Sequence, residues 1–97
     1  MTRIKMEKSS GNVFADLGFD AEEARNLQLR AELMSRIASF VMKSGLSQQE
    51  SAKHLGISQP RLNALLKGKI GDFSLDALVV LLSRIGLEVT MKIKKAA

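Results

Sequence analysis

Residues 46–66 read LSQQESAKHLGISQPRLNALL, and their spacing predicts two short helices joined by a tight turn. A small residue, a glycine and two leucines fall at the fifth, ninth, fifteenth and eighteenth positions counted from the first glutamine. Ala52 is small enough to let the helices cross closely, and Gly56 adopts the positive φ that a turn after a helix requires. Leu62 and Leu65 can then bury one face of the second helix. The stretch therefore encodes a compact helix pair with one apolar and one polar face.

Local capping signals mark the boundaries of both helices. Ser47 and Glu50 have the spacing of a capping box, and Ser58 is a second N-cap that precedes Pro60, a residue tolerated in a first helical turn. Gly68 ends the second helix between two lysines that suit the negative end of its dipole. Two helix starts and a turn with this spacing are typical of a helix-turn-helix that binds DNA. The spacing therefore predicts a DNA-binding regulator.

Composition limits the other classes of protein that the chain can be. Its 97 residues suit one compact domain, which we expect over residues 20–97 behind an N-terminal arm of residues 1–19. The chain has no cysteine and a single histidine, His54, so we expect no disulfide, metal site or cofactor. No apolar run approaches the roughly twenty residues of a membrane span and no signal peptide is recognisable, which favours a cytoplasmic protein without a membrane partner.

Catalytic chemistry finds no support in the sequence. His54 has no cysteine partner, the serines stand at helix-capping positions, and no glycine-rich phosphate loop follows a strand. We therefore expect no catalytic residues and no enzymatic activity.

Positive charge is concentrated on the predicted helix pair. The chain carries a net charge of +5, and residues 43–70 contain five basic residues and one acid, whereas residues 13–36 contain five acids and three bases. A DNA-binding face needs such basic residues to neutralise phosphates. A solvated surface explains scattered charges equally well, so the charge supports DNA binding without establishing it.

The remaining apolar periodicity predicts a mainly α fold. Residues 20–44 place apolar side chains at steps of three and four behind a capping box at Asp20 and Glu23, and they predict one long helix ending at Gly45. Ser74 caps a further helix, which Gly86 ends. The long helix is expected to be the backbone of the core.

The N-terminal arm holds several apolar residues in a segment of weak secondary-structure signal. These residues are Val13, Phe14, Leu17 and Phe19. They can fold back on the domain's own core or form a partner-binding arm, and the sequence leaves both alternatives open.

The period of the apolar pattern changes from 3.6 to 2 near the C-terminus. Apolar and polar residues alternate strictly over residues 87–94, which predicts a β-strand whose apolar face consists of Leu87, Val89, Met91 and Ile93. A single strand in a helical chain needs a partner for its hydrogen-bonding edge. We favour antiparallel pairing with a second copy in a homodimer, which would place two recognition helices symmetrically on a palindromic DNA site. The alternative partner is the arm from Arg3 to Lys8.

Most of the chain resembles a known family. The segments NVFADLGF from Asn12, SQPRLNALLKGK and FSLDALVVLLSRIGLEV are similar to those of the phage-repressor or XRE-like helix-turn-helix regulators, and nearest to the HigA-type antitoxins of toxin–antitoxin pairs. The resemblance implies a five-helix domain that represses its own promoter and neutralises a RelE-like toxin that cleaves messenger RNA. If Val13, Phe14, Leu17 and Phe19 form a partner-binding arm, that toxin is the partner we expect them to contact. The competing functions are a stand-alone regulator and an interaction module that no longer reads DNA.

The resemblance and the motif together select candidate DNA contacts. In similar phage repressors glutamines begin both helices of the motif, and Gln48 and Gln59 stand at those places here. Arg61 suits a guanine edge, and its replacement by alanine should hardly change the stability of the fold. Ser51 and Pro60 depart from the family pattern, and Ser51 replaces a larger apolar residue of many relatives. The candidate DNA-contacting residues are Gln48, Ser58, Gln59, Arg61, Asn63, Lys67 and Lys69.

Overall fold

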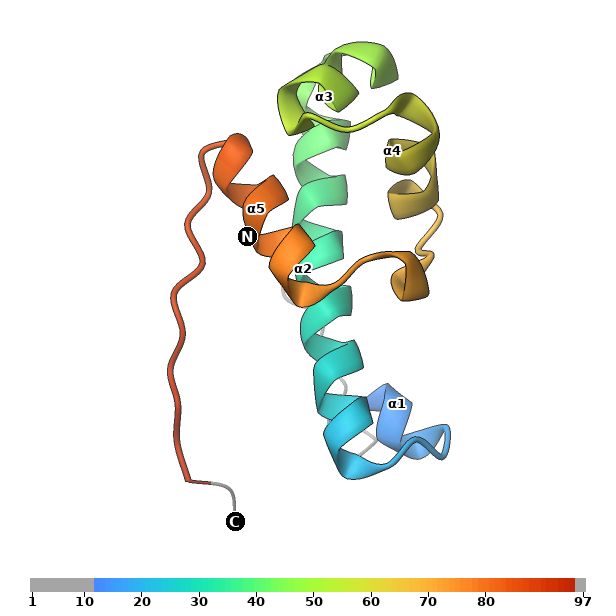
Figure 1. Cartoon of the computed structure of the whole chain (residues 1–97), viewed down its shortest axis with the longest axis vertical. Coiled ribbons are helices and arrows are strands. Elements are labelled where there is room, and N and C mark those ends of the chain that lie inside the picture. Colours follow the sequence, from blue (N-terminus) through green and yellow to red (C-terminus); the bar gives the residue numbers. More distant parts are fainter. Residues whose placement is uncertain (1–11, 96–97) are drawn as a thin grey trace.

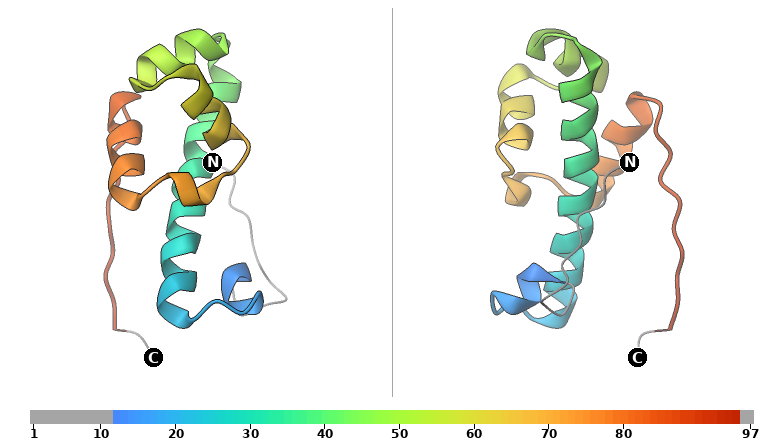
Figure 2. Two further views of the ribbon diagram at one scale, coloured as in Figure 1. Left: turned by 45° about the vertical axis from the view of Figure 1, so that its right-hand side comes forward. Right: turned by 180° about the vertical axis from the view of Figure 1, so that it is seen from behind.

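A computed structural model describes residues 12–95 and shows helices arranged around one long central helix (Figure 1). The elements in chain order are α1 (Val13–Asp16), α2 (Ala21–Ser44), α3 (Gln48–Leu55), α4 (Gln59–Leu66), the 3₁₀ turn η1 (Ile70–Asp72) and α5 (Leu75–Arg84). Helix α2 forms the axis, α3 lies across its C-terminal end, α4 and α5 flank it, and α1 lies at its N-terminal end (Figures 1 and 2). Within residues 12–95 the predicted mainly α, five-helix fold is confirmed.

The helix boundaries follow the capping residues that the sequence marks. The Asp20 side chain accepts a hydrogen bond from the Glu23 backbone N–H at 2.8 Å, and α2 ends at Gly45 with φ of +75°. Ser47 and Glu50 form the reciprocal capping box of α3. These bonds satisfy backbone donors that have no partner within a helix, so each boundary is set by a few neighbouring residues.

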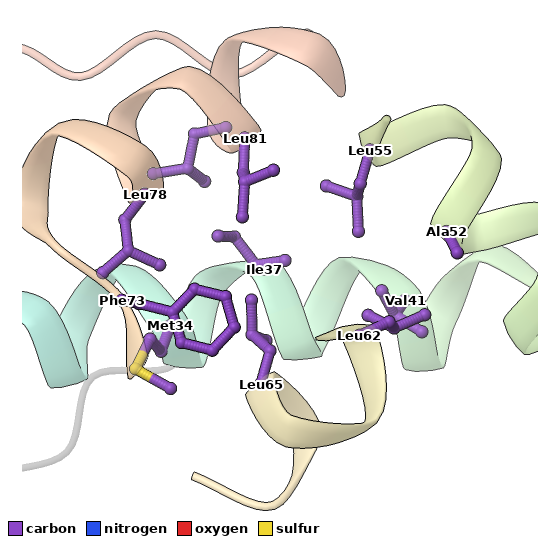
Figure 3. Close-up of a cluster of buried hydrophobic side chains, with 11 residues drawn as sticks. Met34, Ile37, Val41, Ala52, Leu55, Leu62, Leu65, Phe73, Leu78 and Leu81 are labelled. Atoms are coloured by element: carbon purple, nitrogen blue, oxygen red, sulfur yellow. The ribbon is translucent and has the colours of Figure 1, made fainter. Parts of the chain in front are cut away.

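One apolar cluster joins α2 to the four elements that follow it (Figure 3). Ile37 in the middle of α2 is completely buried, as are Leu55 of α3, Leu62 of α4 and Leu78 of α5. Ala52 is buried where α3 packs, as its small size predicts. Because α3, α4 and α5 bury their leucines in one cluster with α2, the orientation of the helix pair is fixed by the core.

Ser51 lies inside this core with its hydroxyl group unsatisfied. Its side chain is 0% exposed, and Oγ has no hydrogen-bond partner among the residues that the structure describes. We expect Ser51→Ala to raise the free energy of unfolding by about 1–2 kcal/mol, because a buried hydroxyl without a partner is costly and alanine favours a helix. Chemical denaturation measures the change. The exposed Ser35 of α2 is the control, and a gain from Ser51→Ala no larger than that from Ser35→Ala would contradict the expectation.

Part of the predicted N-terminal arm is an ordered helix. The Asn12 side chain caps α1 by accepting hydrogen bonds from the backbone N–H groups of Phe14 at 3.0 Å and Ala15 at 3.3 Å. Helix α1 packs against α2, and the rings of Phe14 and Phe19 meet edge to face with centroids 6.2 Å apart. Residues 1–11, including the arm from Arg3 to Lys8, lie outside the described residues.

The predicted β-strand over residues 87–94 is not formed. Within residues 12–95 no segment pairs with this tail, which runs beside the helices in extended form (Figure 2). The Leu87 backbone N–H still bonds to the Leu82 carbonyl at 2.9 Å, and Val89 packs on the core. Farther along, Met91 and Ile93 are 83% and 88% exposed. The alternation is present, but a strand also requires a neighbouring strand to complete its hydrogen bonds.

The same part of the chain contains no membrane-spanning helix and no metal-binding cluster. Every helix in residues 12–95 is too short or too polar to cross a membrane. In this region no three histidine, aspartate or glutamate side chains gather where they could hold a metal ion.

Candidate nucleic-acid interface

The N-terminal turn of α4 presents polar side chains to solvent. Ser58 caps the helix by accepting a hydrogen bond from the Arg61 backbone N–H at 3.2 Å, and Pro60 lies in the first turn. Leu62 is fully buried on the core side of the helix, whereas Gln59 and Asn63 are exposed. A rigid helix with exposed amides at its start can place those amides against base edges in a DNA groove.

The turn between α3 and α4 is held by an arginine from α5. Gly56 has φ of +71°, as predicted, and Ile57 donates its backbone N–H to the Ala52 carbonyl at 3.0 Å. Arg84 donates a hydrogen bond from Nη1 to the Leu55 carbonyl at 2.9 Å and lies against Gly56. The sequence gives no signal for this role of Arg84, because a position in the last turn of α5 does not reveal which carbonyl the side chain reaches.

The segment after α4 presents two lysines. Gly68 has φ of +77°, and the backbone N–H groups of Gly68 and Lys69 bond to the last turn of α4 at 3.0 Å each. Lys67 and Lys69 are exposed, and no acidic side chain of residues 12–95 pairs with either of them. Basic side chains in this setting are available to neutralise phosphates.

All candidate DNA-contacting residues lie on α3, on α4 with its N-cap, or just after α4, and all are exposed. Gln48 begins α3 and Gln59 begins α4, so both glutamines stand at the start of a motif helix. The elements that carry these residues are packed together by the leucines of the core. The structure therefore assembles the candidates on one structural unit, the α3–α4 pair and the turn that follows it.

Arg61 makes a contact that the sequence did not reveal. Its guanidinium carbon lies 4.4 Å from the centre of the Phe73 ring, between η1 and α5. The sequence pattern places Phe73 only in a loop, whereas its side chain is 1% exposed and belongs to the core (Figure 3). A cation over an aromatic face contributes about 0.5–1 kcal/mol at an exposed site, so Arg61→Ala carries a stability cost that the sequence alone does not predict.

Comparisons with known proteins agree with this geometry. Residues 13–94 match a family described as a helix-turn-helix domain. A solved structure titled "Putative XRE Family Transcriptional Regulator" is similar, with a TM-score of 0.71 and 31% sequence identity over 76% of this chain and 83% of that one. No curated protein gives a significant match. The chain therefore belongs to the XRE-like helix-turn-helix family of DNA-binding transcriptional regulators.

Proposed function

We propose that the protein is a non-catalytic, sequence-specific repressor that binds a palindromic operator as a homodimer, with α4 in the major groove. The observation that carries the proposal is the division of α4 into two faces. Leu62 and Leu65 anchor one face in the core, and the other carries exposed amide and guanidinium groups at its N-terminal turn. A helix anchored in this way presents its side chains in a fixed register, which sequence reading requires.

The candidate residues divide by the part of DNA that they suit. Gln59 and Asn63 have amide groups that can donate and accept at once, which matches the N6 and N7 positions of adenine. Lys67 and Lys69 carry point charges suited to phosphate oxygens, which position a protein without reading sequence. Gln48 and Ser58, at helix starts, suit phosphate contacts in the same way.

Sequence-specific DNA binding can be tested by selection from a random duplex library. Gel-shift titration of the enriched duplex then measures the affinity. We expect Gln59→Ala to weaken binding by about 1–3 kcal/mol and to relax the preference at one base pair of each half-site, since it removes a base contact.

Lys67→Ala should instead weaken binding to every duplex and reduce the salt slope by about one unit.

Arg25→Ala is the matched control for loss of a positive charge, because Arg25 is exposed on α2 outside the α3–α4 pair. It should leave binding of the enriched duplex unchanged at moderate salt. Enrichment of no duplex by the wild-type protein would reject the repressor and favour an interaction module that does not read DNA.

Exposed apolar side chains on α5 and the tail support the dimer. Val79 and Val80 of α5 are exposed, and Val79 lines a shallow groove with Leu87 and Val89. Met91 and Ile93, farther along the tail, are also exposed. A second copy would cover these side chains and supply a strand for the tail, which explains an apolar alternation that residues 12–95 do not pair with a strand of their own. Pairing with the Arg3 to Lys8 arm is the alternative.

We further propose that the protein is the antitoxin of a toxin–antitoxin pair and uses α1 and the segment after it to bind a RelE-like toxin. Three of the four apolar side chains predicted to contact a partner stay exposed although α1 packs on α2: Val13, Leu17 and Phe19. Leu17 is 70% exposed, whereas Phe14 is partly buried. The surface lies at the end of α2 away from α3, so toxin and DNA would be bound at opposite ends of the molecule (Figure 1).

Leu17→Glu separates the two roles. With a toxin encoded by the adjacent reading frame, the wild-type protein should relieve growth arrest, and Leu17→Glu should weaken toxin binding at least about tenfold because it places an unpaired charge in an apolar interface. Leu17→Met is the matched control and should retain binding. Operator binding should be equal in all three proteins. Growth arrest that the wild-type protein does not relieve would favour a stand-alone regulator.

A further inference from the structure

We propose that Phe73 is a positioning residue for DNA binding, and that its ring holds the Arg61 guanidinium with its N–H edges ready for a pair of acceptor atoms on DNA. This inference rests on the proposed function and extends it to a residue outside the helix-turn-helix motif. The main support for it is the 4.4 Å distance between the Arg61 guanidinium carbon and the centre of the Phe73 ring.

Phe73 can serve as a platform because it is held from two sides. Its side chain is buried in the apolar cluster with Met34 and Leu78. Its backbone is held by Arg30 of α2, whose Nη1 donates to the carbonyls of Ile70 at 3.2 Å and Phe73 at 3.3 Å. Arg30 is itself oriented by a hydrogen bond of 2.7 Å from Nε to Asn26 Oδ1. The ring under Arg61 is therefore tied to the central helix.

The contact with Phe73 leaves the hydrogen-bonding capacity of Arg61 unused. The five N–H donors of a guanidinium lie in its plane, so a ring against its flat face leaves them pointing outward. No residue of 12–95 accepts a hydrogen bond from this guanidinium. Arg61 is also anchored at its backbone, where its N–H donates to Ser58 Oγ at 3.2 Å. An arginine held in this way loses less conformational entropy on binding than one that is free in solvent.

Two adjacent acceptors match the fork of a guanidinium. On duplex DNA these are O6 and N7 of a guanine or two oxygens of a phosphate. Either source uses the same planar geometry, which a lysine does not reproduce. The two sources differ in sequence dependence, since a guanine contact acts at one base pair and a phosphate contact acts on every duplex.

A double-mutant cycle on the full chain tests the proposal, with the duplex that the wild-type protein selects from a random library as the probe. The variants are Phe73→Leu, Arg61→Ala and their combination, with Phe73→Met as a second replacement that keeps an apolar side chain of similar size. Circular dichroism sets a temperature at which every variant is folded. We expect Phe73→Leu to weaken binding about two- to five-fold when Arg61 is present, the size of one cation–π contact. In the Arg61→Ala protein, Phe73→Leu should change nothing further.

Arg61→Lys then identifies the acceptor. If the acceptor is guanine, Arg61→Ala loses the preference at one base pair, and Arg61→Lys weakens that preference because lysine lacks the planar fork. If it is phosphate, Arg61→Lys retains most of the affinity, and Arg61→Ala weakens binding to all duplexes with a salt slope reduced by about one unit. Either pattern supports the proposal, provided that the effect of Phe73→Leu on binding depends on the presence of Arg61.

Equal effects of Phe73→Leu in the wild-type protein and in the Arg61→Ala protein would show that Phe73 acts only through fold stability, and unchanged affinity in both Phe73 variants would show that it has no role. Each result would overturn the inference and leave the proposed function standing. If the wild-type protein selects no duplex at all, the repressor function and this inference both fail.

Discussion

Gly56→Ala is expected to lower the free energy of unfolding by about 2–3 kcal/mol, because it combines two costs at the turn between α3 and α4. The first is conformational, since alanine is strained at a φ of +71°. The second comes from Arg84, because a Cβ at position 56 would lie 2.6 Å from Nη1 of Arg84. The arginine side chain can swing away, but it then gives up its hydrogen bond to the Leu55 carbonyl. Urea denaturation measures the total cost.

Gly45→Ala is a matched control for the conformational cost alone. Gly45 has φ of +75° at the end of α2, and a Cβ there meets no atom within 4 Å. It should lower the free energy of unfolding by about 1–2 kcal/mol, the cost of a left-handed backbone for alanine. In an Arg84→Ala background the cost of Gly56→Ala should fall to that of Gly45→Ala. An unchanged cost in that background would show that Arg84 does not brace the turn.

Proline at Val89 or Met91 is expected to convert a dimer into a monomer and to weaken binding to a palindromic duplex about 100-fold or more. The physical reason is that proline removes a ladder donor from a tail strand, and two linked DNA-binding units gain about 10²–10⁴ in affinity over one. Weak binding to a single half-site should remain, since both residues follow the last helix and only Val89 packs on the helical core. Analytical ultracentrifugation and gel-shift titration measure the two effects.

A pair of charge variants tests the apolar face of the same segment. Ile93→Lys should weaken the dimer because it replaces an apolar side chain on the face proposed to meet the second copy, whereas Thr90→Lys, on the opposite face, should not. Ile93 is 88% exposed in the single chain, so its replacement has little effect on the monomer itself. An intact dimer in both proline variants and in Ile93→Lys would rule out the tail and point to a helical interface.

Helix boundaries and the helix-turn-helix could be predicted because short-range chemistry sets them. Ser47, Ser58 and Ser74 each accept a hydrogen bond from a backbone N–H three residues later, and a capping serine with its helix can be recognised in a dozen residues. The glycines at 45 and 56 have positive φ where the apolar period is interrupted. The exposed positions of Gln59 and Asn63 follow from the same 3.6-residue period that buries Leu62.

Helix α1 and the C-terminal tail were less predictable, for opposite reasons. Helix α1 has four residues, too few for a periodic pattern, and it depends on packing against α2. The tail has a clear alternation, yet alternation predicts only which side chains share a face. Whether a strand forms depends on a second backbone, and residues 12–95 do not provide one.

By itself the sequence determined helices α2 to α5, the turn that joins α3 to α4 and the polar face of α4, because those features depend on residues within about two helical turns of one another. Only the tertiary structure decided which arginines hold the turn after α3 and the segment at Phe73. Arg84 reaches a carbonyl 29 residues earlier in the chain, and Arg30 reaches carbonyls 40 and 43 residues later. Arg61 rests on Phe73 from a different element. Long, flexible side chains have no sequence period, and their partners are set by which helices the apolar core brings side by side.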